Sequence, residues 1–361
     1  MYRIRTLLCF LLIAPVINAK EMGMTMEMNM DMDMPKHKAP IGVMGDHLMM
    51  KGKVMMSLRL SRMEMSGFQS YGEDISDATV LQQPNPFSQV PAMPMKLSVV
   101  PQSMSMDMLM LGGMYAPSDK VTIMGMAMLE SRDMRLDSYK GMMGRDYLGS
   151  FDTSSSDLSY LSFTALHKIY KTPKSRAHFH LGLSKGIGSN DEAGEVLTPM
   201  NMRTTMTLPY GMQSSDHSTR IIVGLTHVSS FSDFAFGNQL LFDGQISYKD
   251  WAYGDRLNFN SWVQKSYNDV LSYSARLNIR SEDAIRGKDH RIMAPVPTAD
   301  PNNYGGEVVS LGFGVNANLK KRSSNHPNQL GIELMLPINQ DKHGLQLKDK
   351  WSINLGYKVH I

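Results

Sequence analysis

The chain has 361 residues, a formal net charge of +3, and 34 methionines against a single cysteine. The small net charge excludes an electrostatically driven nucleic-acid binder, and one cysteine cannot form a disulfide within the chain. After the first segment, no apolar run reaches the roughly 18 residues that a transmembrane helix needs, so a helical membrane protein is excluded as well.

Residues 1–19 have the features of an export signal. Arg3 and Arg5 precede a short apolar run, and the small residue Ala19 stands at a suitable cleavage position. The only cysteine, Cys9, lies inside this segment. We therefore expect a secreted mature chain that contains no cysteine and must be stabilised by a large core or by a closed sheet.

Residues 20–51 form a methionine-rich leader, which we expect to lie in the periplasm. Its first half has no large aliphatic or aromatic side chain, so it cannot bury a core. Thioether sulfur favours Cu(I), and the carboxylates and histidine between the methionines could add ligands for Cu(II). A copper-binding leader is one interpretation, and a flexible low-complexity segment is the other. The candidate ligands are Met22, Met24, Met26, Met28, Met30, Met32, Met34 and His37.

From residue 52 onward the sequence alternates between apolar and polar positions. At the C-terminus, for example, Ile353 and Leu355 share one face of a strand, and Ser352 and Asn354 share the other. Twelve such segments occur, at 53–65, 103–115, 120–130, 157–169, 175–187, 219–229, 234–248, 256–267, 271–281, 307–319, 328–337 and 350–361. Most are close to the ~9–11 residues of a tilted transmembrane strand and longer than the ~5–6 of a typical soluble strand.

The connections between these segments alternate in length. Each odd connection is longer than the even connections next to it. The odd connections are 66–102, 131–156, 188–218, 249–255, 282–306 and 338–349, and the even ones are 116–119, 170–174, 230–233, 268–270 and 320–327. Short periplasmic turns, long outer loops and an even strand number are typical of bacterial outer-membrane barrels. We predict an all-β fold over 52–361, an antiparallel transmembrane β-barrel of about 12 strands. A soluble β-sandwich is the alternative, but its loops have no reason to alternate in this way.

The polar face of each strand should line the lumen, where charged side chains could set ion preference. The lumen candidates are Arg59, Asp107, His178, His180, Arg276, Arg280, Glu333 and Lys358.

The methionines of two strands are expected to face lipid. Asp107 should face the lumen, and the methionines at 104–110 have the opposite parity, so they and the methionines at 124–128 should point outward. A copper ladder formed by these two rows is the alternative. Met55, Met63 and Met65 share the polar parity of their strand and should line the interior. Four aromatic residues near strand ends, Tyr115, Tyr170, Trp251 and Trp351, should form an interfacial girdle.

Catalysis has little support, because the G-x-S-x-G, H-E-x-x-H and P-loop motifs are all missing. Some outer-membrane barrels are lipid hydrolases with an exposed Ser-His pair, but nothing marks His217-Ser218 or another serine as a nucleophile. We therefore expect that the protein is not an enzyme and requires no cofactor.

Several segments resemble a family of outer-membrane transporters that is related to the barrel proteins named for the phenol meta-cleavage (MetA) pathway. The matching segments are IGVMGDHLM (41–49), SMSMDMLMLGGMYAPSD (103–119), VLTPMNM (196–202), LPYGMQ (208–213) and RIMAPVPTADPNNYGGE (291–307). The resemblance covers roughly 41–361. It implies an outer-membrane barrel that acts as a transporter in settings associated with copper resistance, and it carries over no catalytic residues.

Together these features predict a barrel in the outer membrane of a Gram-negative bacterium that passes or binds a small solute. Its expected partners are outer-membrane lipid and the barrel assembly machinery, and no nucleic acid. Two alternatives remain: a metal-associated barrel whose leader sequesters copper, and a structural or adhesion barrel that acts through its outer loops. The motifs within 196–213 and 291–307 fall in long outer loops, where inward folding would constrict the lumen.

Overall fold

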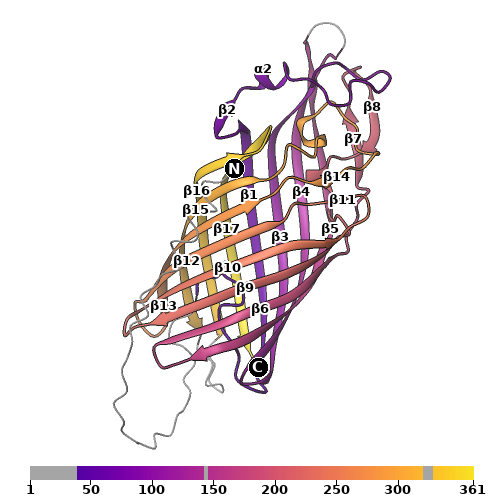
Figure 1. Cartoon of the computed structure of the whole chain (residues 1–361). Coiled ribbons are helices and arrows are strands. Elements are labelled where there is room, and N and C mark those ends of the chain that lie inside the picture. Colours follow the sequence, from indigo (N-terminus) through magenta and orange to yellow (C-terminus); the bar gives the residue numbers. More distant parts are fainter. Residues whose placement is uncertain (1–38, 142–144, 320–327) are drawn as a thin grey trace, which may run out of the picture. The chain divides into compact units, whose positions relative to one another are not determined.

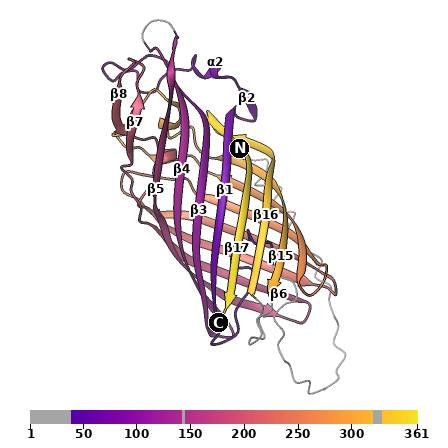
Figure 2. The same cartoon turned by 180° about the vertical axis from the view of Figure 1, so that it is seen from behind.

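Twelve antiparallel strands close into a single barrel in the computed structural model, which describes residues 39–141, 145–319 and 328–361 (Figures 1 and 2). The strands are β1 (Val54–Ser70), β3 (Val99–Ser118), β4 (Val121–Tyr139), β5 (Tyr147–Lys171), β6 (Ser175–Gly186), β9 (Thr219–Ser230), β10 (Phe234–Ser247), β12 (Arg256–Ser266), β13 (Leu271–Glu282), β15 (Gly306–Leu319), β16 (Asn328–Lys342) and β17 (Gln346–His360). Each strand pairs with its neighbour along the chain, and β17 pairs with β1 to close the sheet. The predicted fold is confirmed, and each predicted segment corresponds to one strand.

The alternation of side chains explains why these segments form a closed sheet. Leu58 and Leu60 on β1 are exposed on the outer face, whereas Arg59 and Ser61 between them are buried on the inner face. The same order recurs around the barrel, where apolar side chains form the outer band. In hydrocarbon an open sheet edge would leave backbone groups unpaired, and closure through β1 and β17 removes both edges.

The two ends of the barrel differ. One end, here called the turn end, carries the C-terminus, the end of β15, the start of β16, and the connections 119–120, 172–174, 231–233 and 267–270. The other, the loop end, carries the connections 71–98, 187–218, 248–255, 283–305 and 343–345, and residues 140–141 and 145–146 between β4 and β5. The small elements there are β2 (Glu73–Ile75), α2 (Asp77–Val80), β7 (Ala193–Leu197), β8 (Arg203–Thr207), η1 (Tyr210–Met212), β11 (Trp251–Ala252), β14 (Arg286–Gly287) and η2 (Pro297–Ala299). Among the described residues, no helix is long and apolar enough to cross a membrane.

Two predicted connections are wrong in length. Most of the expected loop 131–156 is strand, because β4 continues to Tyr139 and β5 begins at Tyr147. The outward side chains there, such as Asp133 and Ser154, are polar and exposed, so this part of the sheet extends beyond the apolar band. The last connection is the short turn 343–345, which reverses the expected contrast with 320–327.

The long connections fold inward at the loop end and bury an apolar core. Val80 of α2, Leu208 and Met212 of the β8–β9 connection, and Ile292 and Ala299 of the β13–β15 connection are all fully or nearly fully buried. We call this inward-folded set of loops the loop-end cap. Trp251 belongs to it and not to an interfacial girdle: it is 1% exposed and packs edge-on against Tyr210 with ring centroids 4.9 Å apart.

Candidate functional site

Residues 39–50 lie inside the barrel at the turn end, and we call them the plug segment. Although the sequence pattern assigns residues 20–51 to the leader, Ala39, Ile41, Val43 and Met49 are almost completely buried against the barrel wall. The boundaries of the predicted leader and barrel domains stay predictions, but residues 39–50 pack as part of the barrel's interior.

Barrel side chains hold the plug segment through its backbone carbonyl groups. Arg59 Nη1 donates to Gly42 O (3.0 Å), Gln239 Nε2 to Met44 O (2.8 Å), and His178 Nε2 to Gly45 O (2.8 Å). In the reverse direction, the backbone N–H of Met49 donates to Thr122 Oγ1 at 2.9 Å. These partners come from β1, β4, β6 and β10, so the plug segment is held from opposite sides of the lumen.

Glycines allow a close fit between the plug segment and the wall. Gly331 on β16 and Gly356 on β17 lie directly opposite each other in the sheet. A Cβ atom at Gly331 would lie 2.9 Å from Ile41 Cβ, and one at Gly356 would collide with the Ile41 side chain. The paired glycines therefore form a recess that the Ile41 side chain fills. On the plug itself, Gly45 has φ +63°, a conformation that favours glycine.

One carboxylate anchors the plug segment electrostatically. Asp46 Oδ1 lies 3.0 Å from His47 Nδ1 and 3.7 Å from Lys358 Nζ on β17, and Asp46 Oδ2 accepts a hydrogen bond from Ala39 N at 3.4 Å. All four residues are buried. A buried charge is costly unless it is paired and hydrogen-bonded, and inside the lumen Asp46 meets this requirement through His47, Lys358 and Ala39 N.

Next to the plug segment, an ion-pair network joins side chains on the inner face of the barrel wall. Arg276 makes a bidentate pair with Glu333, Nε to Oε1 at 2.8 Å and Nη2 to Oε2 at 2.7 Å, and its Nη1 donates to Asn260 Oδ1 at 2.8 Å. Asn354 Nδ2 also donates to Glu333 Oε2 at 3.4 Å. A Cβ atom at Gly42 would collide with both charged groups, so the plug backbone lies directly against this network.

The loop-end cap is fixed to the wall by a second polar network. Arg132 donates to Gln213 O and pairs with Glu130, while Tyr253 Oη donates to Tyr210 O at 2.6 Å. Tyr210 Oη accepts from the backbone N–H of Asp289 at 2.8 Å, which joins the two inward-folded motif loops. These contacts attach the segment 208–213 to the inner face of the wall at the loop end. A constriction of the lumen there stays a prediction.

The structure places most of the predicted lumen residues on the inner face. Arg59, His178, His180, Arg276, Glu333 and Lys358 are buried there, and Arg280 is partly buried and pairs with Asp349 at 2.9 Å. The rings of His178 and His180 lie 4.9 Å apart, and His180 Nε2 bonds Thr226 Oγ1 at 2.8 Å. No group of three or more His, Cys, Asp or Glu side chains that could hold a metal occurs in the described parts of the chain.

Asp107 is not a lumen residue. Its side chain is 47% exposed on the outer face and pairs with Arg62 at 3.3 Å. The expectation failed because this level of β3 lies beyond the apolar band, where an outward carboxylate meets a polar environment. As a consequence, the methionines of opposite parity face the lumen and not lipid: Met104, Met114, Met124 and Met128 are all buried inside. Met55 of β1 lies on the same inner face, where its parity placed it.

Sequence reasoning missed two residues of this site. One is Asp46, which pairs with Lys358, and the other is Gln239, which donates to a plug carbonyl group. The motif 41–49 was noticed, but its residues have no alternating pattern that would place them in space. A signal was nevertheless present, because glycines that face each other in two neighbouring strands, as Gly331 and Gly356 do in β16 and β17, mark a recess. The leader residues Met22 to Met34 and His37 lie outside the described residues.

At the loop end, a cavity of about 280 Å³ lies between the β1–β3 and β13–β15 connections. Ile75, Leu97 and Leu345 give it apolar walls, and Gln83 and Asn303 add polar groups.

The chain is similar to an outer membrane channel from Pseudomonas putida F1, with 11% identity, a TM-score of 0.53, and coverage of 88% of this chain and 99% of that one. The fold is that of an outer-membrane β-barrel. The beta domain of the Bordetella autotransporter BrkA (10% identity, 85% and 99% coverage, TM-score 0.43) and the P. putida toluene transporter TodX (9% identity, 85% and 89% coverage, TM-score 0.41) align too loosely to carry an argument. No protein-family model and no curated protein matches the chain.

Proposed function

We propose that the protein is an outer-membrane channel for a small solute, with the plug segment closing its periplasmic side. Since long connections mark the outer side of such barrels, the turn end would face the periplasm. The observation that carries the proposal is the way the plug segment is held. A segment bound through hydrogen bonds, one buried ion pair and one apolar recess can leave and return without breaking the barrel wall.

The polar inner face supports passage more than a purely structural role. Arg276, Glu333, Asn260 and Asn354 line the lumen with charged and amide groups, whereas a barrel that only anchors loops needs no such lining. The loop-end cavity would be the first contact for a solute from outside. Its volume of about 280 Å³ is near the lower end of the roughly 300–1,000 Å³ of small-molecule sites, which favours a small, partly apolar solute.

Liposome uptake tests this function. The full chain and a variant lacking residues 39–50 are reconstituted into liposomes, and entry of neutral solutes of increasing size is followed. We expect entry of small solutes with a size limit, and faster entry for the variant. If both preparations are as impermeable as protein-free liposomes, the channel proposal is wrong and the loops become the functional part.

A second candidate function concerns the leader. We propose that Met22 to Met34 and His37 bind copper, because seven thioethers with intervening carboxylates suit Cu(I) and Cu(II). Equal Cu(I) binding by a full chain whose leader methionines are leucine would contradict it. The relation to the phenol meta-pathway barrels, the outer-membrane location and the contact with the assembly machinery are further proposals that rest on the sequence motifs and the barrel fold.

A further inference from the structure

Methionines gather on the inner face of three neighbouring strands. Of the thirteen methionines on β1, β3 and β4, only Met56 points outward; the other twelve occupy inward positions. The outward apolar positions of the same strands are filled mainly by leucine, isoleucine and tyrosine, such as Leu58, Leu111 and Ile123. Methionine is therefore not used here as a general hydrophobic residue, because a general use would place it on both faces.

Strand register aligns some of these methionines in rows across the three strands. Met114 on β3 is directly opposite Met55 on β1 and Met124 on β4. Directly opposite residues in an antiparallel sheet have Cβ atoms about 4.5–5.5 Å apart, so the three thioethers can reach a common point. We call Met55, Met114 and Met124 the inner row.

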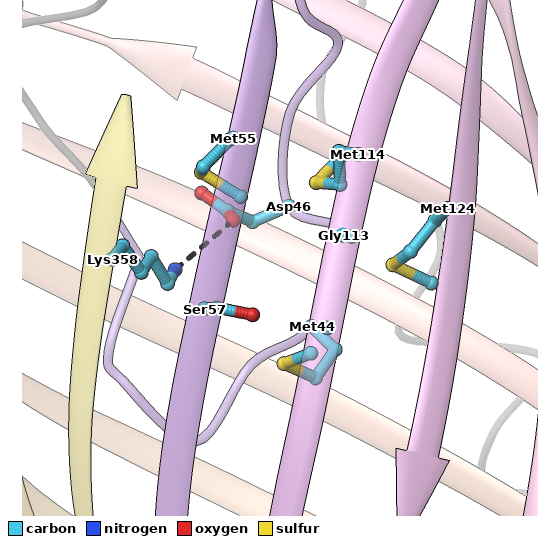
Figure 3. Close-up of a pocket in the computed structure, with 10 residues that line it drawn as sticks. Met44, Asp46, Met55, Ser57, Gly113, Met114, Met124 and Lys358 are labelled. Carbon is cyan, nitrogen blue, oxygen red and sulfur yellow. Dashed lines mark ion pairs between the residues drawn. The ribbon is translucent and has the colours of Figure 1, made fainter. Parts of the chain in front are cut away.

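The plug segment adds a fourth thioether to the inner row. Met44 lines the same cavity as the three strand methionines, and Figure 3 shows all four side chains around it, with Asp46 and Lys358 at one side. The cavity volume is about 10 Å³. This is close to the minimum of roughly 10–15 Å³ that holds one water molecule, so the space admits a single ion and no larger molecule.

We propose that Met44, Met55, Met114 and Met124 form a binding site for one soft monovalent metal ion, Cu(I) or its analogue Ag(I). Four neutral thioethers from two separate parts of the chain converge on an ion-sized cavity, and thioether sulfur selects soft ions over Zn(II), Mg(II) or Na(I). A monovalent ion suits the surroundings, because Asp46, the one carboxylate among the described residues that line the cavity, is already paired with Lys358. The site would tie the plug segment to the barrel wall whatever solute the channel passes.

Apolar packing is the competing explanation, since Met49, Met55, Met114 and Met124 also belong to one buried cluster. The barrel provides a matched control against it. A second row, Met65 on β1, Met104 on β3 and Met134 on β4, is also directly opposite across the three strands, but it packs into the apolar core of the loop-end cap. Met104 and Met134 are buried like the inner row, and Met65 is partly buried. Packing alone predicts that leucine would behave alike in both rows.

The test measures Cu(I) affinity of the full chain in detergent by competition with a chromophoric Cu(I) chelator. Every protein carries leucine at the seven leader methionines, Met22 to Met34, so that the leader does not contribute. Met114→Leu is compared with Met134→Leu, and heat-modifiable migration in gels verifies that both variants are folded. Leucine is nearly equal in volume to methionine, so the barrel should tolerate both changes.

We expect the starting protein to bind one Cu(I) per chain, with an all-sulfur coordination shell by X-ray absorption. The Cu(I) affinity of Met114→Leu should be about 10–100-fold lower than that of Met134→Leu, which is the loss typical of a weakened metal site. Ag(I) should compete and Zn(II) should not. Three results would overturn the proposal. The starting protein binds no Cu(I), Met114→Leu binds Cu(I) as tightly as the starting protein, or Met134→Leu loses as much Cu(I) affinity as Met114→Leu. Channel uptake is measured separately, so failure here leaves the proposed function standing.

Discussion

Lys358 Nζ on the last barrel strand lies 3.7 Å from Asp46 Oδ1 on the plug segment. The pair joins residues more than three hundred positions apart and connects the segment that fills the lumen to the strand that closes the barrel (Figure 3). Both groups are buried, so loss of either one would leave the other without this ion-pair partner inside the lumen. This contact makes docking of the plug segment sensitive to single substitutions that leave the barrel itself intact.

Lys358→Met should release the plug segment. Removing one partner of a buried ion pair costs about 3–5 kcal/mol when the remaining charge is left uncompensated. Asp46 keeps His47 at 3.0 Å, so we expect a loss below that range. We expect faster protease cleavage within residues 39–50 and a higher bilayer conductance. The double variant Asp46→Asn with Lys358→Met should recover part of the docking, since no buried charge remains. Equal cleavage of the single variant and the natural chain would contradict the role of this pair.

Filling the glycine recess should also displace the plug segment. Gly331→Leu puts a side chain where Ile41 lies, so we expect the same increase in conductance while the barrel remains folded. Gly113→Ala is the control, because a Cβ there meets no atom within 4 Å. An unchanged conductance for Gly331→Leu would show that Ile41 does not hold the plug segment.

Orientation in the membrane can be tested with single cysteines, because the only natural cysteine lies in the predicted signal peptide. Met200→Cys at the loop end should react with a membrane-impermeant maleimide on intact cells. Lys174→Cys at the turn end should react only after the outer membrane is ruptured. The opposite order of labelling would reverse the proposed topology.

The limits of the apolar band can be tested with arginine. Leu334→Arg on the outer face of β16 should destabilise the barrel by about 2–4 kcal/mol if it lies near the bilayer midplane. Ser154→Arg, on the outward polar part of β5, should cost about 0–1 kcal/mol. Unfolding in urea from lipid vesicles gives both values, and equal costs would contradict the explanation given for the outward carboxylate of Asp107.

Acid should not open the loop-end cap above about pH 5. The Arg291 side chain bonds both carboxylate oxygens of Asp289, at 2.6–3.2 Å, and this hydrogen bonding holds the pKa of Asp289 below its usual value. A carboxylate with a lowered pKa contributes stability that is present above its unfolded pKa and is lost as the pH falls through the folded one. Fluorescence of the buried Trp251 should therefore stay constant from about pH 8 to pH 5. A transition within that range would contradict the assignment.

The twelve strands could be predicted because the alternation of apolar and polar residues is a local property. Within each strand, this alternation shows which face meets lipid. Strand ends could not be predicted at β4 and β5, since pairing continues beyond the bilayer where the outward residues become serine and aspartate. Asp107 shows the same limit, because its polarity was read as a sign of the lumen when it marked the edge of the apolar band.

The candidate site was only partly predictable. Parity placed His178, Arg276 and Glu333 on the inner face, but it could not show that they meet the plug segment. Residues 39–50 form no strand, and their contacts are with residues far away along the chain. Their position depends on a recess between β16 and β17 and on carbonyl contacts, which involve backbone groups that every residue has.

The most direct test of the account compares single-channel currents of the full chain and a variant lacking residues 39–50 in planar bilayers. If the plug segment closes the lumen, the full chain should show low or intermittent conductance, and the deletion should show a larger, steady conductance. Both proteins must show the same heat-modifiable migration, so that a folding defect is excluded. Identical currents from the two folded proteins would contradict the claim that residues 39–50 control passage through the barrel.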